Sequence, residues 1–212
     1  MQAFAFSQFA IEKKYLKPRY DIDGEEHVLP PEFLRAMEML VQGSTDAALT
    51  NLQAALAKEP GYLPALTEIY KIYLKKNDRS GAIEFGSQVV DGLTKLGEPP
   101  QAIEMYYKLL EPFPDASLKP AIQFRIADSL VKHGQFREAA VAYRNLATNN
   151  PGGAMAQKAL LMCGNILTDK VKDHKNAINV YRYLAKTYPQ SDFLEYAKQG
   201  YDRAQKALKD NV

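Results

Sequence analysis

The feature that most constrains this chain is a short residue pattern that returns five times along it. Each copy begins with an alanine and a small or apolar neighbour. Further small or apolar residues follow four and seven positions after the alanine. These spacings lie on one side of an α-helix, and a proline that cannot continue the helix follows four of the five copies. The pattern predicts five amphipathic helices. The five alanines are Ala48, Ala82, Ala102, Ala139 and Ala177.

Another apolar stripe of helical period precedes each of these segments. The stripes are expected as first helices around residues 33–40, 66–74, 89–96, 122–130 and 160–167. Short turns separate them from the second helices, at residues 43–46, 77–78, 97–100, 133–134 and 172–173, and contain glycine, asparagine, aspartate or proline. The repeating unit is therefore predicted to be a helical hairpin.

The intervals between the five alanines are 34, 20, 37 and 38 residues. Three of them are close to the roughly 34 residues of a helical-hairpin repeat. The interval from Ala82 to Ala102 is too short for a hairpin, so one helix over about 79–97 is expected to close one unit and open the next. We expect an irregularity near residues 79–102, with a change of direction or two lobes. The last unit has about one extra residue before Asp173.

Two segments resemble units of the tetratricopeptide repeat (TPR) family. In residues 120–151 the family's small residue of the first helix is Ala127 and its turn residue is Gly134. The second helix has Ala139 and Tyr143, and Pro151 closes it. Residues 157–189 look like another unit, and the ending at 188–191 is similar to that of TPR proteins of bacterial envelope assembly. The resemblance covers roughly residues 30–209. It implies an all-α, right-handed α-α superhelix, or solenoid, of about five hairpins with a capping helix at about 191–209.

Residues 1–29 differ from the rest and are expected to form a separate N-terminal arm or connector. Aromatic residues alternate there with lysine and arginine, and an acidic block follows at 21–26. A loosely docked arm is one reading. A juxtamembrane connector is the other, because aromatic and basic residues gather where a helix leaves a bilayer.

Composition excludes several classes of protein. The 27 basic and 25 acidic residues provide no basic excess for nucleic-acid binding. No apolar run approaches the roughly 18 residues of a membrane span, and the first residues lack the basic region of a secretory signal. We therefore expect a cytoplasmic protein, with a tether to the inner membrane as the alternative if a segment upstream or the N-terminal arm provides one.

Candidate groups for catalysis or metal binding are few, so we expect a non-enzymatic protein without cofactor or metal. His133 and His174 fall in turns, where exposed polar residues are expected, and His27 lies in the arm. The single cysteine, Cys163, is surrounded by aliphatic residues and is expected to be buried and inert. The sequence contains no CxxC or HxxxH pair and no phosphate-binding glycine motif.

The resemblance implies that the first helices line a concave groove, whose polar positions would bind a partner. Their cations outnumber their acids by five to two, which favours an acidic peptide or a terminal carboxylate, although a mixed charged surface is also the ordinary state of a solvated helix. The carboxylate clamp of chaperone-binding TPR proteins is not reproduced. The groove positions are Thr67, Lys71, Lys75, Gln88, Asp91, Lys95, Phe124, Arg125, Asp128 and Lys132.

The leading hypothesis is a protein–protein interaction scaffold that binds a peptide or protein in the concave groove. Three alternatives remain open. The chain could be the soluble regulatory or adaptor tail of a bacterial membrane protein of the rhomboid-protease or envelope-assembly type. It could self-associate into a homo-oligomer through its open ends or its arm, or it could be an enzyme with a site assembled across the groove.

Overall fold

A computed structural model describes residues 29–210 of the chain. Within that range all regular structure is helical, with ten α-helices, one π-helical turn and no strand. The predicted all-α solenoid of hairpins is confirmed. No helix in residues 29–210 is long and apolar enough to cross a membrane. The predicted N-terminal arm lies outside the described residues, except for Leu29.

The described helices belong to two compact units that divide at Gly92 and Leu93. The first unit contains α2 (Pro31–Val41), α3 (Thr45–Lys58), α4 (Leu63–Lys75) and most of α5 (Arg79–Lys95). Its core joins α2, α3 and α4 through buried apolar side chains such as Phe33, Leu52 and Ile69. The rings of Phe33 and Tyr62 are nearly perpendicular, with 5.3 Å between their centroids.

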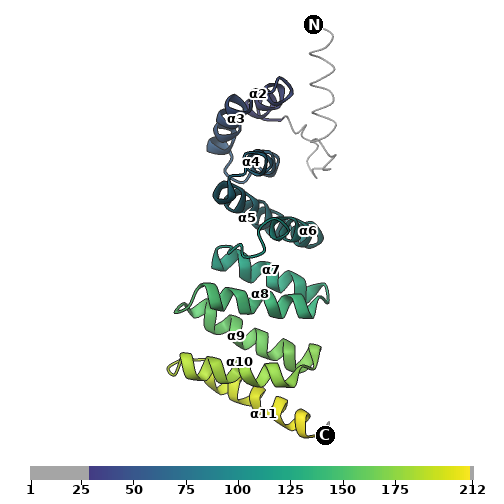
Figure 1. Cartoon of the computed structure of the whole chain (residues 1–212), viewed down its shortest axis with the longest axis vertical. Helices are drawn as coiled ribbons and strands as arrows, with labels where there is room; N and C mark the ends of the chain where they lie inside the picture. Colours follow the sequence, from purple (N-terminus) through teal and green to yellow (C-terminus); the bar gives the residue numbers. More distant parts are fainter. Residues whose placement is uncertain (1–28, 211–212) are drawn as a thin grey trace, which may run out of the picture. The chain divides into compact units, whose positions relative to one another are not determined.

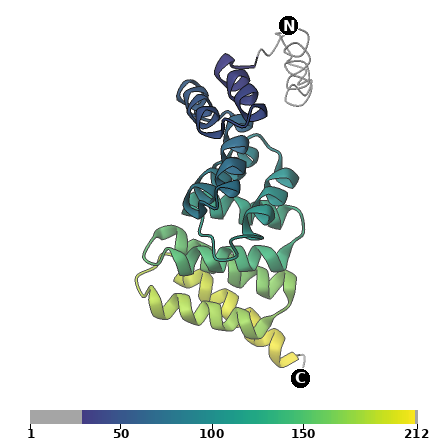
Figure 2. The same ribbon diagram turned by 45° about the horizontal axis from the view of Figure 1, so that its top comes forward.

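The second unit begins with the last residues of α5 and continues through six more helices (Figure 1). These are α6 (Pro99–Leu110), α7 (Pro120–Lys132), α8 (Phe136–Asn149), α9 (Ala154–Ile166), α10 (His174–Thr187) and α11 (Leu194–Asp210). From α6 onwards each helix packs against the next one. The run from α7 to α11, coloured from teal through green to yellow, is a stack of antiparallel helices in both views (Figures 1 and 2).

Four of the inter-helix turns have the same backbone geometry. The residue that leaves each first helix has a positive φ, which glycine or asparagine adopts at low cost. In the first of these turns, Gly43 N–H donates to Leu40 and Ser44 N–H donates to Met39, the two hydrogen bonds of a Schellman motif. The same pair recurs in the next three turns. The four left-handed residues are Gly43, Asn77, Gly97 and Gly134.

Each left-handed residue stands five positions before the alanine that begins the sequence pattern, as Gly43 does before Ala48. The helix stop and the apolar stripe of the next helix are therefore spaced alike in every unit. This spacing also explains the short interval. Helix α5 begins after the turn at Asn77 and ends in the turn at Gly97, so it is a second helix at its start and a first helix at its end. The expected irregularity near 79–102 is this single, doubly used helix.

The fifth turn contains the extra residue expected before Asp173. Helix α9 continues into a π-helical turn, Leu167–Val171, and Lys172 has the left-handed backbone with φ 62°. Asp173 N–H donates to Leu167, six residues back rather than five as in the other four turns. A π-helical turn absorbs one inserted residue without breaking the helix, so the insertion is placed after Ile166.

Candidate functional site

The first helices of the second unit, α7, α9 and α11, contact one another in sequence order: α7 packs on α9 and α9 packs on α11. We call the surface that these three helices form the first-helix face. Helices α8 and α10 each pack against the first helix before and after them. Side chains from α8 and α10 can therefore reach between two first helices, and two tyrosines do so.

Tyr143 of α8 is completely buried, and its hydroxyl donates to the carboxylate of Asp128 on α7. Its ring meets the ring of Phe124 at a steep angle of 70°, with 5.3 Å between centroids. Burial, together with the hydrogen bond to Asp128, raises the pKa of Tyr143 well above its usual range. The phenol therefore stays neutral and holds the Asp128 carboxylate in place.

Tyr181 of α10 repeats the arrangement one unit later. Its hydroxyl donates to Oδ1 of Asn165 on α9 over 2.8 Å. The same oxygen lies 3.4 Å from Nη2 of Arg203 on α11, and Nη2 of Arg203 is 3.5 Å from a carboxylate oxygen of Asp169. Buried Tyr181 therefore anchors a polar row that runs from α9 to α11.

Two glycines allow this close packing around Tyr181. A Cβ atom on Gly164 of α9 would lie 2.5 Å from the ring, and one on Gly200 of α11 would lie 2.4 Å from it. Both distances are shorter than any ordinary carbon contact. Helices α9 and α11 therefore approach α10 at positions that have no side chain, and this sets the spacing of the first-helix face.

The charges of the first-helix face are arranged unevenly. On α7 and α9 the one acid, Asp128, accepts a hydrogen bond from Tyr143, and Asp169 of the π-helical turn lies beside Arg203. Helix α11 has three exposed acids, Glu195, Asp202 and Asp210. Lys158 of α9 is exposed and lies over the Phe124 ring, with its Nζ 4.9 Å from the centroid. Lys132 at the end of α7 is also exposed. The available charge on α7 and α9 is positive.

The structure places the predicted groove residues in both units. In the second unit Phe124, Arg125, Asp128 and Lys132 are on α7, and Lys95 ends α5. Phe124, Arg125 and Asp128 are half-buried rather than open to solvent. Phe124 and Asp128 support Tyr143, so their first role is structural.

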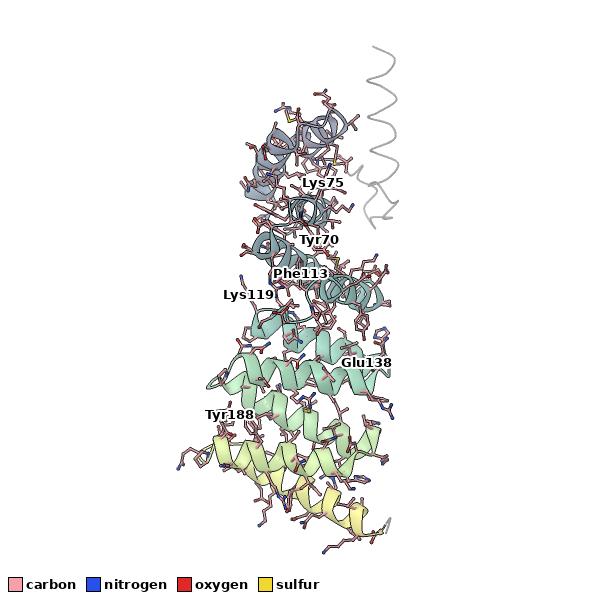
Figure 3. The ribbon with its side chains drawn as sticks, viewed as in Figure 1. Tyr70, Lys75, Phe113, Lys119, Glu138 and Tyr188 are labelled. Atoms are coloured by element: carbon pink, nitrogen blue, oxygen red, sulfur yellow. The ribbon has the colours of Figure 1, made fainter. Side chains whose placement is uncertain are left out.

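In the first unit Thr67, Lys71 and Lys75 are on α4, and Gln88 and Asp91 are on α5. The hydroxyl of Thr67 donates to the backbone oxygen of Leu63, within the helix. Lys71 is exposed, but its ammonium is 2.6 Å from a carboxylate oxygen of Glu68, whose side chain is 8% exposed. Lys75 is exposed near the helix end, and Figure 3 labels it.

Sequence reasoning missed three residues of the first-helix face: Lys158, Asn165 and Arg203. The signal for Asn165 was present, because it follows Gly164 as Asp128 follows Ala127 one unit earlier. The extra residue of this unit hid the correspondence. Since the π-helical turn begins after Asn165, the register of α9 up to that point is unchanged.

Two of the residues weighed for chemistry gave different outcomes. His174 was expected to be exposed in a turn, and this was wrong: it is the first residue of α10, is 8% exposed, and its Nδ1 has no hydrogen-bond partner within residues 29–210. Cys163 is buried, as predicted, and its thiol lies 3.3 Å from the backbone oxygen of Ala140. Burial raises the pKa of Cys163 to about 12, with nearby Arg144 opposing the shift. In the described part of the chain no three histidine, cysteine or acidic side chains gather as metal ligands.

Comparison with known proteins finds one matching family model and several similar solved structures. The tetratricopeptide repeat family model matches residues 124–192. YrrB, a TPR protein with an unusual peptide-binding site, is 15% identical with a TM-score of 0.42, over 91% of this chain and 98% of that one. Pseudomonas aeruginosa pilF is 18% identical with a TM-score of 0.35, over 82% of this chain and 79% of that one.

A tetratricopeptide repeat protein from Parabacteroides merdae is 16% identical with a TM-score of 0.37, over 85% of this chain and 73% of that one. No curated protein sequence matches this chain.

Proposed function

We propose that this chain, whose residues 124–192 match the tetratricopeptide repeat family model, is an interaction scaffold that binds a protein partner on the first-helix face. The partner contributes an extended acidic segment. Solenoid repeats present a continuous surface made from the same helix of each unit, and partners use such surfaces. The function is argued from this surface, since a fold alone does not define one.

The observation that carries the proposal is the positive charge of the part of the first-helix face that α7 and α9 form. On α7 and α9 the one acid, Asp128, accepts a hydrogen bond from Tyr143, whereas Lys158 and Lys132 extend to solvent. A carboxylate of a partner would form charge-assisted hydrogen bonds with these ammonium groups. The half-buried Phe124 ring beside Lys158 provides an apolar contact next to the charge.

The proposal also rests on the rigidity of this surface. Asp128 and Asn165 are held by buried tyrosine hydroxyls, so the polar groups that face a partner are already placed before it binds. Binding to a preorganised surface loses less conformational entropy than binding to a mobile one. In the first unit, taken by itself, the exposed Lys75 at the end of α4 is proposed to contact a carboxylate of the partner.

The test begins with a crosslinking pull-down to identify the partner, followed by affinity measurements on charge-reversal variants. In the second unit Lys132→Glu and Lys158→Glu are combined, and in the first unit Lys75→Glu is made alone. Lys71 is left unchanged, because reversing it would place two acids together at the buried Glu68. The matched control reverses Lys175 and Lys186, two exposed lysines of α10.

We expect the K132E/K158E variant to weaken binding at least about tenfold, the size of effect that loss of close charged contacts produces. The control should bind as the unchanged protein does, and circular dichroism should be the same for all variants. Equal affinities for the K132E/K158E variant and the control would refute binding on this face.

A further inference from the structure

A second feature of the second unit is separate from the first-helix face. A cavity of about 510 Å³ opens between α8, the end of α9 with its π-helical turn, and the start of α10. Figure 3 marks this end of α8 by Glu138, next to the cavity residue Arg137. Its size lies within the several hundred cubic ångströms that small-molecule sites occupy.

The extra residue of the fifth turn shapes this cavity. Leu167 and Val171 of the π-helical turn line it, and so does Lys172, whose left-handed backbone ends the turn. The other four turns lack the π-helical turn and close with five-residue hydrogen bonds. The cavity walls therefore contain residues whose position depends on the insertion.

The polar lining is dominated by unpaired cations. Arg137 and Arg144 stand seven residues apart on α8, about two helical turns, and both are exposed, as is Lys172. None of the three forms an ion pair or side-chain hydrogen bond with another residue in the range 29–210. The acid of the lining, Asp173, caps α10: its two carboxylate oxygens accept from the backbone N–H and the side-chain amide of Asn176.

The remaining lining is apolar. Ala140 and Val141 of α8 lie between the two arginines in sequence, and Leu167, Val171 and buried Cys163 complete it. Val141 is 46% exposed, although it is a large aliphatic side chain. A ligand that covered Val141 would remove apolar surface from water and would bring its charge between the guanidinium groups.

We propose that this cavity binds a small organic anion in which a carboxylate is attached to an apolar group of about the size of a leucine side chain. Arginine suits the anionic end, because its planar guanidinium forms paired hydrogen bonds with a carboxylate. The apolar end contacts Val141, Leu167 and Val171. Two sources carry this chemistry, the C-terminal residue of a peptide and a free aliphatic acid.

The test is an NMR titration of the full chain labelled with ¹⁵N, using three probes at equal millimolar concentration. N-acetyl-L-leucine represents a peptide C-terminus, hexanoate represents a free acid, and N-acetyl-L-leucinamide is the uncharged counterpart of the first. We expect the acids to shift the amide signals of Val141, Leu167 and Lys172, and the amide probe to leave them unchanged. The acid that binds more tightly identifies the source.

Variants connect the signals to the arginines. Arg137→Gln with Arg144→Gln should weaken binding of the preferred acid at least about tenfold, and each single change should weaken it less. Lys175→Gln with Lys186→Gln, on the exposed surface of α10, is the control and should bind as before. The proposal is overturned if the acids cause no shifts at the cavity, if the uncharged amide shifts the same signals equally, or if the double arginine variant binds like the control.

Discussion

At the scale of single residues, the tyrosines of this chain show how differently a buried phenol can be satisfied. The hydroxyl of Tyr143 donates to Asp128, and that of Tyr181 donates to Asn165. The hydroxyl of Tyr62 is also buried but has no hydrogen-bond partner in the described residues. Removing a paired group and removing an unpaired one should therefore have different consequences.

We predict that Tyr143→Phe lowers the free energy of unfolding by about 1 to 2 kcal/mol, because it leaves the half-buried Asp128 carboxylate without its donor. Tyr62→Phe removes a hydroxyl with no partner and should be neutral or stabilising by up to about 1 kcal/mol. Urea unfolding followed by circular dichroism measures both. Equal losses would mean that the Asp128 hydrogen bond contributes nothing specific.

Cys163 offers a second residue-scale prediction. Only the thiolate reacts with alkylating reagents, and a pKa of about 12 leaves very little of it at neutral pH. We expect iodoacetamide to modify the folded protein at least about a hundredfold more slowly than the protein unfolded in urea, whose cysteine has an ordinary pKa near 8.5. Mass spectrometry of the single-cysteine chain gives both rates. Rapid modification of the folded state would show that Cys163 is accessible.

At the scale of helices, the spacing of α9, α10 and α11 depends on residues without side chains. Gly164 and Gly200 both approach the Tyr181 ring, from two first helices. Gly164 lies near the end of α9, where the helix continues into the π-helical turn, so glycine there costs helix stability compared with alanine. The close packing at Tyr181 explains why glycine is nevertheless suitable there.

We predict that Gly164→Ala and Gly200→Ala each destabilise the second unit by about 1 to 3 kcal/mol, the usual cost of overpacking, despite the better helix propensity of alanine. Gly153→Ala is the matched control. A Cβ atom there would meet only a backbone nitrogen at 4.0 Å, and the φ of Gly153 is an ordinary −86°. Thermal unfolding compares the three. A stabilised Gly164→Ala variant would contradict the close approach to Tyr181.

At the scale of the whole molecule, burial of tyrosines couples stability to alkaline pH. Burial, with the nearby Glu59, raises the pKa of Tyr62 to about 12. Burial also raises the pKa values of Tyr106, Tyr143 and Tyr181. The folded chain therefore keeps phenol protons that the unfolded chain releases near pH 10, so the unfolded state binds fewer protons and stability falls as pH rises.

We predict that the free energy of unfolding is constant with respect to these groups below about pH 9 and falls between about pH 10 and about pH 12. The Tyr62→Phe variant should lose less over this window than the unchanged chain. Tyr183→Phe, at a side chain that is 49% exposed, serves as the control. Urea titrations at several pH values measure the effect, and a stability that rises through this window would reverse the assigned direction of the shifts.

Much of the molecule could be predicted from local sequence. The alanine pattern and the glycine or asparagine before it are short-range signals, since an amphipathic stripe and a left-handed helix end depend on neighbouring residues. The short interval between Ala82 and Ala102 also predicted that α5 belongs to two successive hairpins. The burial of His174 could not be predicted in this way, because its position next to a turn does not show which residues the neighbouring helices cover.

The candidate sites could likewise be predicted only in part from the sequence. The sequence by itself determined that Phe124, Asp128 and Lys132 share one helix of a repeat, because that depends only on helical period and spacing. Only the tertiary structure decided that Asp128 is occupied by Tyr143, that Asn165 and Arg203 join it on the first-helix face, and that the inserted residue becomes a π-helical turn beside Arg137 and Arg144. The hydrogen bonds among them join residues 15 or more positions apart in sequence. Their geometry depends on how closely the helices pack.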